Sequence, residues 1–114
     1  VVVPQEPRRR LKKYEELLPH FLETKALAFS SDYTAVEAIN FFTDRGIRIP
    51  DQISITVFDD NFYAQIVRPK LTTIHQDVHQ KAVLALRKLL LMAEGKEPAK
   101  KNVKSPVWLV REIL

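Results

Sequence analysis

The chain contains no cysteine, only two glycines, and no apolar run long enough to cross a membrane, which takes about 18 residues. The absence of cysteine excludes disulfides, zinc ribbons and thiol catalysis. Gly46 and Gly95 lie far apart in the sequence, whereas a loop that cradles a phosphate needs clustered glycines. Nucleotide binding of that type is therefore not expected, and the sequence predicts no cofactor.

The sequence does contain enough apolar residues for a core. Of its 114 residues 46% are apolar, and 18 Lys and Arg oppose 14 Asp and Glu. This composition predicts one small globular domain rather than a disordered chain. The chain begins with three valines and no Met, without the pattern of a secretory signal, and it ends on an apolar stretch. We therefore expect a segment of a longer protein.

Helical periodicity and short apolar runs alternate along the chain. Helices are predicted over 8–22, 34–45, 62–67 and 77–93, and strands over 26–29, 53–58, 71–74 and 106–113. This alternation predicts an α/β fold in which helices cover a parallel sheet. The first strand is expected to be buried on both faces. Pro19 should break or kink the first helix, and Asp32 or Thr34 should cap the second.

Polar side chains follow two of the predicted strands at the point where each ends. Asp59 and Asp60 come after one strand, and Ser30, Ser31 and Asp32 come after another. In open α/β sheets, ligands bind outside the carboxyl ends of the strands. A carboxylate can accept hydrogen bonds from several hydroxyls, which suits a sugar or another polyol. From residue types alone, helix capping and turn formation are the more common roles.

Two chemical alternatives involve the histidines. His75 and His79 have helical i, i+4 spacing, but Asp77 would point away from both, so no metal site is predicted. Asp59, Asp60 and His75 are acid–base residue types, yet no nucleophile elbow accompanies them. We therefore expect a protein that is not an enzyme.

Basic and leucine-rich stretches have ordinary interpretations. The basic run at 8–13 is flanked by glutamates and lacks interleaved aromatic residues, so a solvated helix face is expected rather than a nucleic-acid site. The wide apolar stripe of the helix over 77–93 indicates core, or contact with another subunit or domain.

Five segments together resemble a known family, with their order and spacing preserved from about Tyr14 to the end of the chain. They resemble the family's "ND-x-x-A" turn, its "G-x-x-x-P-x-D-(I/V)-S-(I/V)" connector, and its "G-F/Y-D-D", "P-x-L-T-T-I-x-Q" and "L-V-x-R" motifs, at residues 26–35, 44–55, 58–60, 69–76 and 109–112. The chain is thereby similar to transcriptional regulators of the lactose-repressor and galactose-repressor type.

The resemblance implies a periplasmic-binding-protein-like fold, a three-layer parallel sheet with covering helices in which one lobe is incomplete. Residues 1–114 would be the C-terminal part of an effector-binding and dimerisation domain, with a crossover helix over 77–94. It implies a cytoplasmic repressor segment that senses a sugar or related metabolite. Operator DNA would be bound only through a helix-turn-helix absent from this chain, and no membrane is involved.

Individual residues take roles from this resemblance. Asp59 resembles the aspartate that binds the effector, Ser31 stands where the family usually has a contacting Asn, and Gln76 lies at the lobe crossover. Val57 replaces a usual Gly. The implied dimer surface comprises Val36, Ile39, Phe62, Tyr63 and Val67.

A periplasmic-type or extracellular sugar-binding protein is the alternative. For the chain by itself, we expect a dimer or larger assembly that covers the apolar face of the helix over 77–94. In one such arrangement, this helix or the last strand is exchanged between chains. We also expect weak or absent sugar binding, because half of the pocket wall is missing.

Overall fold

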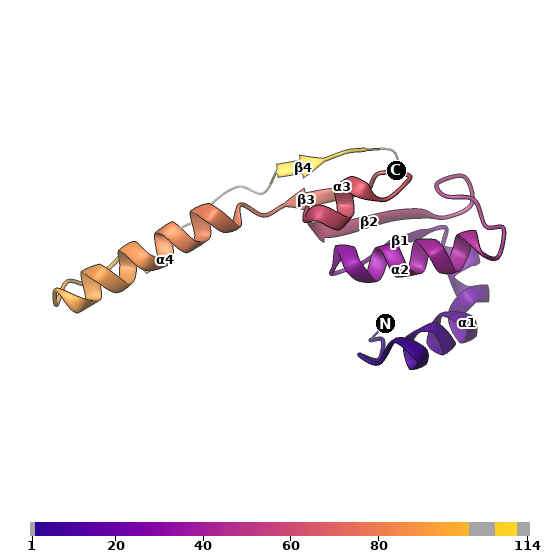
Figure 1. Ribbon diagram of the computed structural model, residues 1–114, viewed down its shortest axis with the longest axis horizontal. Coiled ribbons are helices and arrows are strands. Elements are labelled where there is room, and N and C mark those ends of the chain that lie inside the picture. The colour runs from indigo at the N-terminus through magenta and orange to yellow at the C-terminus, as the bar shows by residue number, and fades with distance from the viewer. Residues whose placement is uncertain (1, 101–106, 112–114) are drawn as a thin grey trace.

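A computed structural model of the chain describes residues 2–100 and 107–111 (Figure 1). The elements are α1 (Pro7–Thr24), β1 (Ala26–Ala28), α2 (Asp32–Thr43), β2 (Ser54–Asp59), α3 (Phe62–Ile66), β3 (Thr72–His75), α4 (Val78–Ala93) and β4 (Val107–Leu109). The predicted alternation of helices and strands is confirmed. Of the strand predicted over 106–113, residues 106, 112 and 113 lie outside the described residues.

The four strands form one sheet in the order β1-β2-β3-β4. The first three are parallel, with Leu27 opposite Ile55 and Asp59 opposite His75. Strand β4 is antiparallel to β3, which the prediction of an all-parallel sheet did not include. Figure 1 shows α4 projecting beyond the end of the sheet and β4 running beside β3 in the opposite direction.

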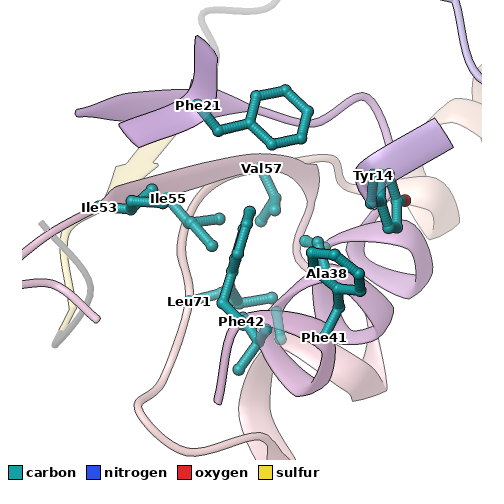
Figure 2. Close-up of a cluster of buried hydrophobic side chains, with 12 residues drawn as sticks. Tyr14, Phe21, Ala38, Phe41, Phe42, Ile53, Ile55, Val57 and Leu71 are labelled. Carbon is teal, nitrogen blue, oxygen red and sulfur yellow. The ribbon is translucent and has the colours of Figure 1, made fainter. Parts of the chain in front are cut away.

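The core lies on one face of the sheet, where both long helices of the N-terminal half pack. Alternate residues of β2, Ile55 and Val57, are at most 4% exposed, as period-2 side-chain alternation requires. Aromatic rings fill the space between helices and sheet, with Tyr14 and Phe41 centroids 5.7 Å apart (Figure 2). The buried apolar residues are Tyr14, Phe21, Ala35, Ala38, Ile39, Phe41, Phe42, Ile53, Ile55, Val57, Ala64 and Leu71.

The first strand is not buried on both faces. Ala26 and Ala28 are exposed and Leu27 is half-buried. Strand β1 is the edge of the sheet, and α1 and α2 pack on the opposite face from its two alanines. Phe58 of β2, on that same uncovered face, is 40% exposed. Among the described residues, therefore, the helices that pack on the sheet gather on one side of it.

Helix α1 continues past Pro19 to Thr24, so the predicted break is wrong. Proline removes one N–H from the helix ladder, and the carbonyl left without its partner belongs to Glu15. Pro19 and Glu15 are both exposed, so water can satisfy that carbonyl. The burial of Phe21, two residues further on, holds the last part of the helix against the core.

Helix α4 contributes nothing to the core of the chain. None of its residues is buried; Val78 is 70% exposed and Leu89 is 61% exposed. Figure 1 shows the helix extending away from the sheet, and the long axis of the molecule measures 58 Å. Among the residues that the structure describes, no core buries the apolar stripe of α4, and its contact with another subunit or domain stays a prediction.

The basic run of α1 is not entirely solvated, because Arg10 is 4% exposed. Its guanidinium donates to both carboxylate oxygens of Glu37 on α2. Its Nη1 also donates to the carbonyls of Pro4 and Gln5, at 3.2 and 2.7 Å. Arg10 thus joins the N-terminal segment, α1 and α2 at one point, a role that the solvated-face interpretation missed.

Replacing Arg10 with Met should lower the free energy of unfolding by about 3 kcal/mol, because it leaves the Glu37 carboxylate, 17% exposed, without its partner. Urea denaturation measures this. Lys13→Met is the control, since Lys13 pairs with Glu16 in an exposed setting and its loss should change stability by less than about 0.5 kcal/mol. Equal losses in the two variants would contradict the structural role of Arg10.

Candidate functional site

The carboxyl ends of β1, β2 and β3 meet at one edge of the sheet, because these strands are parallel. Strand β2 ends there at Asp59, and Asp60 follows it; these two residues form a tip with φ angles of 129° and 59°. Positive φ is unfavourable for residues other than glycine, so the tip is strained and must be held by its surroundings. Such strain is common where a side chain is positioned for binding.

Asp60 is held by two basic side chains. Arg111 Nη1 donates to its Oδ1 at 2.7 Å, and His75 Nδ1 lies 3.0 Å from its Oδ2. The side chain of Asp60 is 6% exposed. The backbone N–H of Arg111 donates to Thr72 Oγ1 at 2.9 Å, which fixes the residue to β3. Asp60 is therefore turned into the protein and braces the tip.

Asp59 and Gln76 lie together, although 17 positions separate them in the sequence. The Gln76 side-chain amide donates to Asp59 Oδ1, and the Gln76 backbone N–H donates to the Asp59 carbonyl at 3.2 Å. Lys81 of α4 donates to the Gln76 amide oxygen. A half-buried carboxylate, an amide and an ammonium thus form a chain of donors and acceptors that hydroxyl groups could join.

Ser31 occupies a different place. It is half-buried at the N-cap of α2, where its side chain makes no capping bond. It lines a cavity of about 770 Å³ between the N-terminal segment and β1, and Asp59 and Gln76 do not line this cavity. The structure therefore brings together two of the three residues predicted to bind a ligand.

Asp32 connects the ends of β1 and β2. It is fully buried in the first turn of α2, and its Oδ2 accepts the backbone N–H of Asn61 at 2.7 Å. Neither Asp32 nor Thr34 caps α2, because the Asp32 carboxylate is turned to Asn61 and the Thr34 hydroxyl donates to the Ser31 carbonyl. Burial raises the pKa of Asp32, the Asn61 N–H opposes this, and the charges of Asp59 and Asp60 add to the rise.

The histidine pair does not share a helix. His75 belongs to β3 and faces Asp60, whereas His79 lies in α4. Asp77 caps α4 by accepting the backbone N–H of Gln80 at 2.8 Å. Across residues 2–100 and 107–111, no three potential metal ligands gather in one place.

The predicted dimer residues divide by burial. Ile39 is 2% exposed and packs in the core, so it cannot form part of an exposed interface. Phe62 and Tyr63 are 68% and 42% exposed. Val36 and Val67 are partly buried against the core. Tyr33 packs edge-on against Tyr63, with centroids 5.7 Å apart, and extends this aromatic surface beyond the residues that the sequence indicated.

Sequence reasoning missed the role of Arg111, although the residue stands in a quoted motif. Its partner Asp60 lies 51 positions earlier, and no local pattern joins them. The approach of β4 to β3 brings the two together. The two aspartates at the end of β2, Asp59 and Asp60, did indicate a polar site at this edge. Their sequence does not show that the Asp60 carboxylate is the one turned inward.

Comparison with known proteins decides the family. A model of the periplasmic binding protein-like domain matches residues 2–112. This chain belongs to that family. The expected fold class is thereby confirmed, and so is the resemblance to regulators of the lactose-repressor and galactose-repressor type. In the described part of the chain, no helix has both the length and the apolar character needed to cross a membrane.

The relatives are transcriptional regulators. The chain is 36% identical over 97 residues to the HTH-type transcriptional regulator GalR of Escherichia coli, covering 84% of this chain and 28% of GalR. The structure of the E. coli transcriptional repressor ascG superposes with a TM-score of 0.80 at 25% identity, covering 98% of this chain and 41% of that one. A LacI-family regulator from Lactobacillus casei with bound sucrose gives 0.65 at 27% identity, covering 79% and 33%. The chain therefore spans less than half of each relative.

The buried Asp32 predicts a particular pH dependence. Its pKa in the folded chain is raised above the ordinary 3.8, so between these two values the folded chain holds a proton that the unfolded chain has released. Relative to Asp32→Asn, which does not titrate and keeps an oxygen for the Asn61 N–H, the free energy of unfolding of the wild type should fall as pH rises above 3.8. Urea denaturation at several pH values measures the difference.

The control for this experiment is Asp44→Asn, which changes an exposed carboxyl. A wild-type stability that runs parallel to that of Asp32→Asn across the acidic range would show that the fold does not raise the Asp32 pKa.

Proposed function

We propose that this chain is the ligand-sensing and dimerisation segment of a DNA-binding transcriptional repressor that responds to a sugar or related metabolite. The observation that carries the proposal is the pairing of Asp59 and Gln76 at the carboxyl edge of the sheet, on a strained and firmly braced tip. Ligands of open α/β sheets bind at this edge. The names of the relatives, and the sucrose in the L. casei structure, agree with it.

The ligand chemistry follows from the donors and acceptors at the tip. Asp59 offers carboxylate oxygens to hydroxyl groups, and Gln76 fixes one of them while Lys81 fixes Gln76. An ionised acceptor held in one orientation forms stronger hydrogen bonds than a neutral one. Ser31, at the neighbouring strand end, would contact a ligand large enough to extend along the edge of the sheet. The role is binding rather than catalysis, and no cofactor takes part.

Regulation would follow from two lobes that close on the ligand. A ligand that contacts both lobes favours the closed form by its difference in affinity for the two forms. In a dimer this closure changes the spacing of two DNA-binding heads, which must match half-sites about one helical turn apart. The helix-turn-helix heads are not part of this chain, and the assembled repressor would act in the cytoplasm.

Dimerisation is proposed to use the aromatic surface formed by Val36, Phe62, Tyr63 and Val67. Phe62 and Tyr63 expose large rings next to each other, with centroids 6.5 Å apart, and Tyr33 extends the patch. Aromatic residues are enriched in protein interfaces because each buries a large area at a small entropy cost. The exposed leucines of α4 form a second apolar surface, which two copies could cover by exchanging this helix.

In the complete regulator, Asp59→Asn should raise the sugar concentration needed to release operator DNA by about tenfold or more, because hydrogen bonds to a charged group contribute about 1.5–3 kcal/mol. Operator affinity without sugar should remain unchanged. Asp51→Asn is the control, since Asp51 lies away from this edge and pairs with Arg48. Fluorescence anisotropy of labelled operator DNA measures both quantities, and an unaltered sugar response would exclude Asp59 from the binding site.

The chain by itself should bind sucrose and common monosaccharides with dissociation constants weaker than about 1 mM, because it holds only one wall of the pocket. Isothermal calorimetry measures this, and tight binding would contradict a two-lobed site. The reading frame upstream separates the two candidate functions: a helix-turn-helix supports the repressor, whereas an export signal supports a periplasmic-type sugar-binding protein.

The isolated chain should form a dimer or larger assembly, and two variants locate the interface. Phe62→Glu places a charge on the aromatic surface and should weaken the dimer by at least about tenfold, whereas Leu89→Glu on α4 should not. Sedimentation equilibrium measures the association. The reverse pattern would assign dimerisation to exchange of α4, and a monomeric wild type at high micromolar concentration would exclude both surfaces.

A further inference from the structure

Lys81 of α4 lies beside the tip and has no carboxylate partner among the described residues. Its backbone N–H donates to the Asp77 carbonyl at 3.1 Å, so an acidic side chain stands four residues earlier on the same helix. Acid–base pairs at this spacing are common on helix surfaces. Here the Asp77 carboxylate instead accepts the Gln80 N–H, and the Lys81 ammonium donates to the Gln76 amide oxygen. The positive charge is therefore turned to the tip rather than to its neighbour on the helix.

The two carboxylates of the tip differ in what balances their charge. Asp60 is paired with Arg111 at 2.7 Å, and its side chain is 6% exposed. Asp59 contacts only the neutral Gln76 amide through Oδ1, and its Oδ2 accepts no hydrogen bond from the described residues. One carboxylate and one ammonium thus remain available to a ligand, on opposite sides of the Gln76 amide.

The Gln76 amide also sets the separation of these two charges. Its nitrogen donates to Asp59, and its oxygen accepts from Lys81. Two hydrogen bonds and one amide group place Asp59 Oδ1 and Lys81 Nζ at most about 8 Å apart. A single sugar ring with its substituents has a comparable length, so one small molecule can contact both charges. Repulsion by Asp59 and attraction by Lys81 then favour one orientation of an anionic sugar, with its hydroxyls at Asp59 and its anionic group at Lys81.

We propose that the ligand of this edge is a sugar that carries an anionic group, a carboxylate or a phosphate, and that Lys81 binds this group. The inference rests on the proposed sugar-sensing function and specifies the class of its ligand. An ammonium has three donors, so Lys81 keeps two after it bonds to Gln76, and its exposure leaves them accessible.

Closure of the two lobes strengthens this preference. Hydrogen bonds between an ammonium and an anionic oxygen are charge-assisted, and they gain strength where water is excluded. A neutral sugar would satisfy Asp59 but would leave the Lys81 ammonium without a counter-charge in the closed form. Burial of an unpaired charge is costly, so a neutral ligand favours closure less than an anionic one.

Release of operator DNA by matched sugars tests the ligand class in the complete regulator. The probes are glucose, galactose and mannose, each compared with its uronate and its 6-phosphate, so that only position 6 changes. Sodium acetate equalises the ionic strength of all samples, because DNA binding depends on salt. For at least one of these sugars, an anionic form should half-release labelled operator DNA, followed by fluorescence anisotropy, at a concentration at least about tenfold below that of the neutral form. The uronate and phosphate arms distinguish the two anionic groups.

Three variants assign the preference to Lys81. Lys81→Gln keeps an N–H donor for Gln76 and removes the charge, so it should abolish the preference for the anionic form while changing the response to the neutral form by less than about threefold. Lys81→Arg keeps the charge and should retain the preference. Arg87→Met removes a charge from α4 more than one turn further along, and as the matched control it should leave both responses unchanged.

Three results would overturn the proposal. Neutral sugars that act at the same or lower concentrations than their anionic forms would exclude an anionic ligand and leave the sugar-sensing function standing. Equal loss of the neutral and anionic responses in Lys81→Gln would restrict Lys81 to holding Gln76. Release of operator DNA by none of the probes would count against both the anionic ligand and sugar sensing, so the two failures are distinguishable.

Discussion

The packing of α2 against β2 is the constraint on which the rest of the structure depends. The helix contributes Ala38 and Phe42 to the core, and the strand contributes Ile55. All three side chains are completely buried in this one cluster. This contact fixes which face of the sheet is covered. The carboxyl ends of β1, β2 and β3 meet at one edge because these strands are parallel. The tip formed by Asp59 and Asp60 follows the strand against which α2 packs, so its position depends on this contact.

The tip itself combines backbone strain with opposing charges. Asp59 and Asp60 adopt positive φ, a costly conformation that persists only when neighbours over-determine it. Arg111 holds Asp60 from the β4 side, and Asp32 holds the Asn61 N–H from the α2 side. Three carboxylates near one guanidinium leave an excess of acceptors, which is suited to a ligand that donates hydrogen bonds. The strain and the charge distribution therefore serve the same function, the positioning of Asp59.

Several surfaces of the chain lack partners within it. Most leucines of α4 are exposed, and the alanine face of β1 is uncovered. Each lies where the chain's own elements end, at the sheet edge or beyond it. A domain buries such surfaces when its layers are complete. Among the described residues, these surfaces are an apolar helix face, a sheet face and one strand edge.

The sequence by itself determined the elements and the fold class, because periodicity and turn residues are local signals. Its resemblance to a family also indicated Asp59 and Gln76 as residues near a ligand, whereas the predicted cap of α2 was wrong. Only the tertiary structure decided the rest. The pairing of Asp60 with Arg111, the burial of Arg10 against Glu37 and the exposure of α4 arise from contacts between distant segments, and they depend on which faces meet. Local patterns show that a side chain is polar or apolar, but its partner, and hence its pKa and its role, is set by the packing that brings remote strands and helices together.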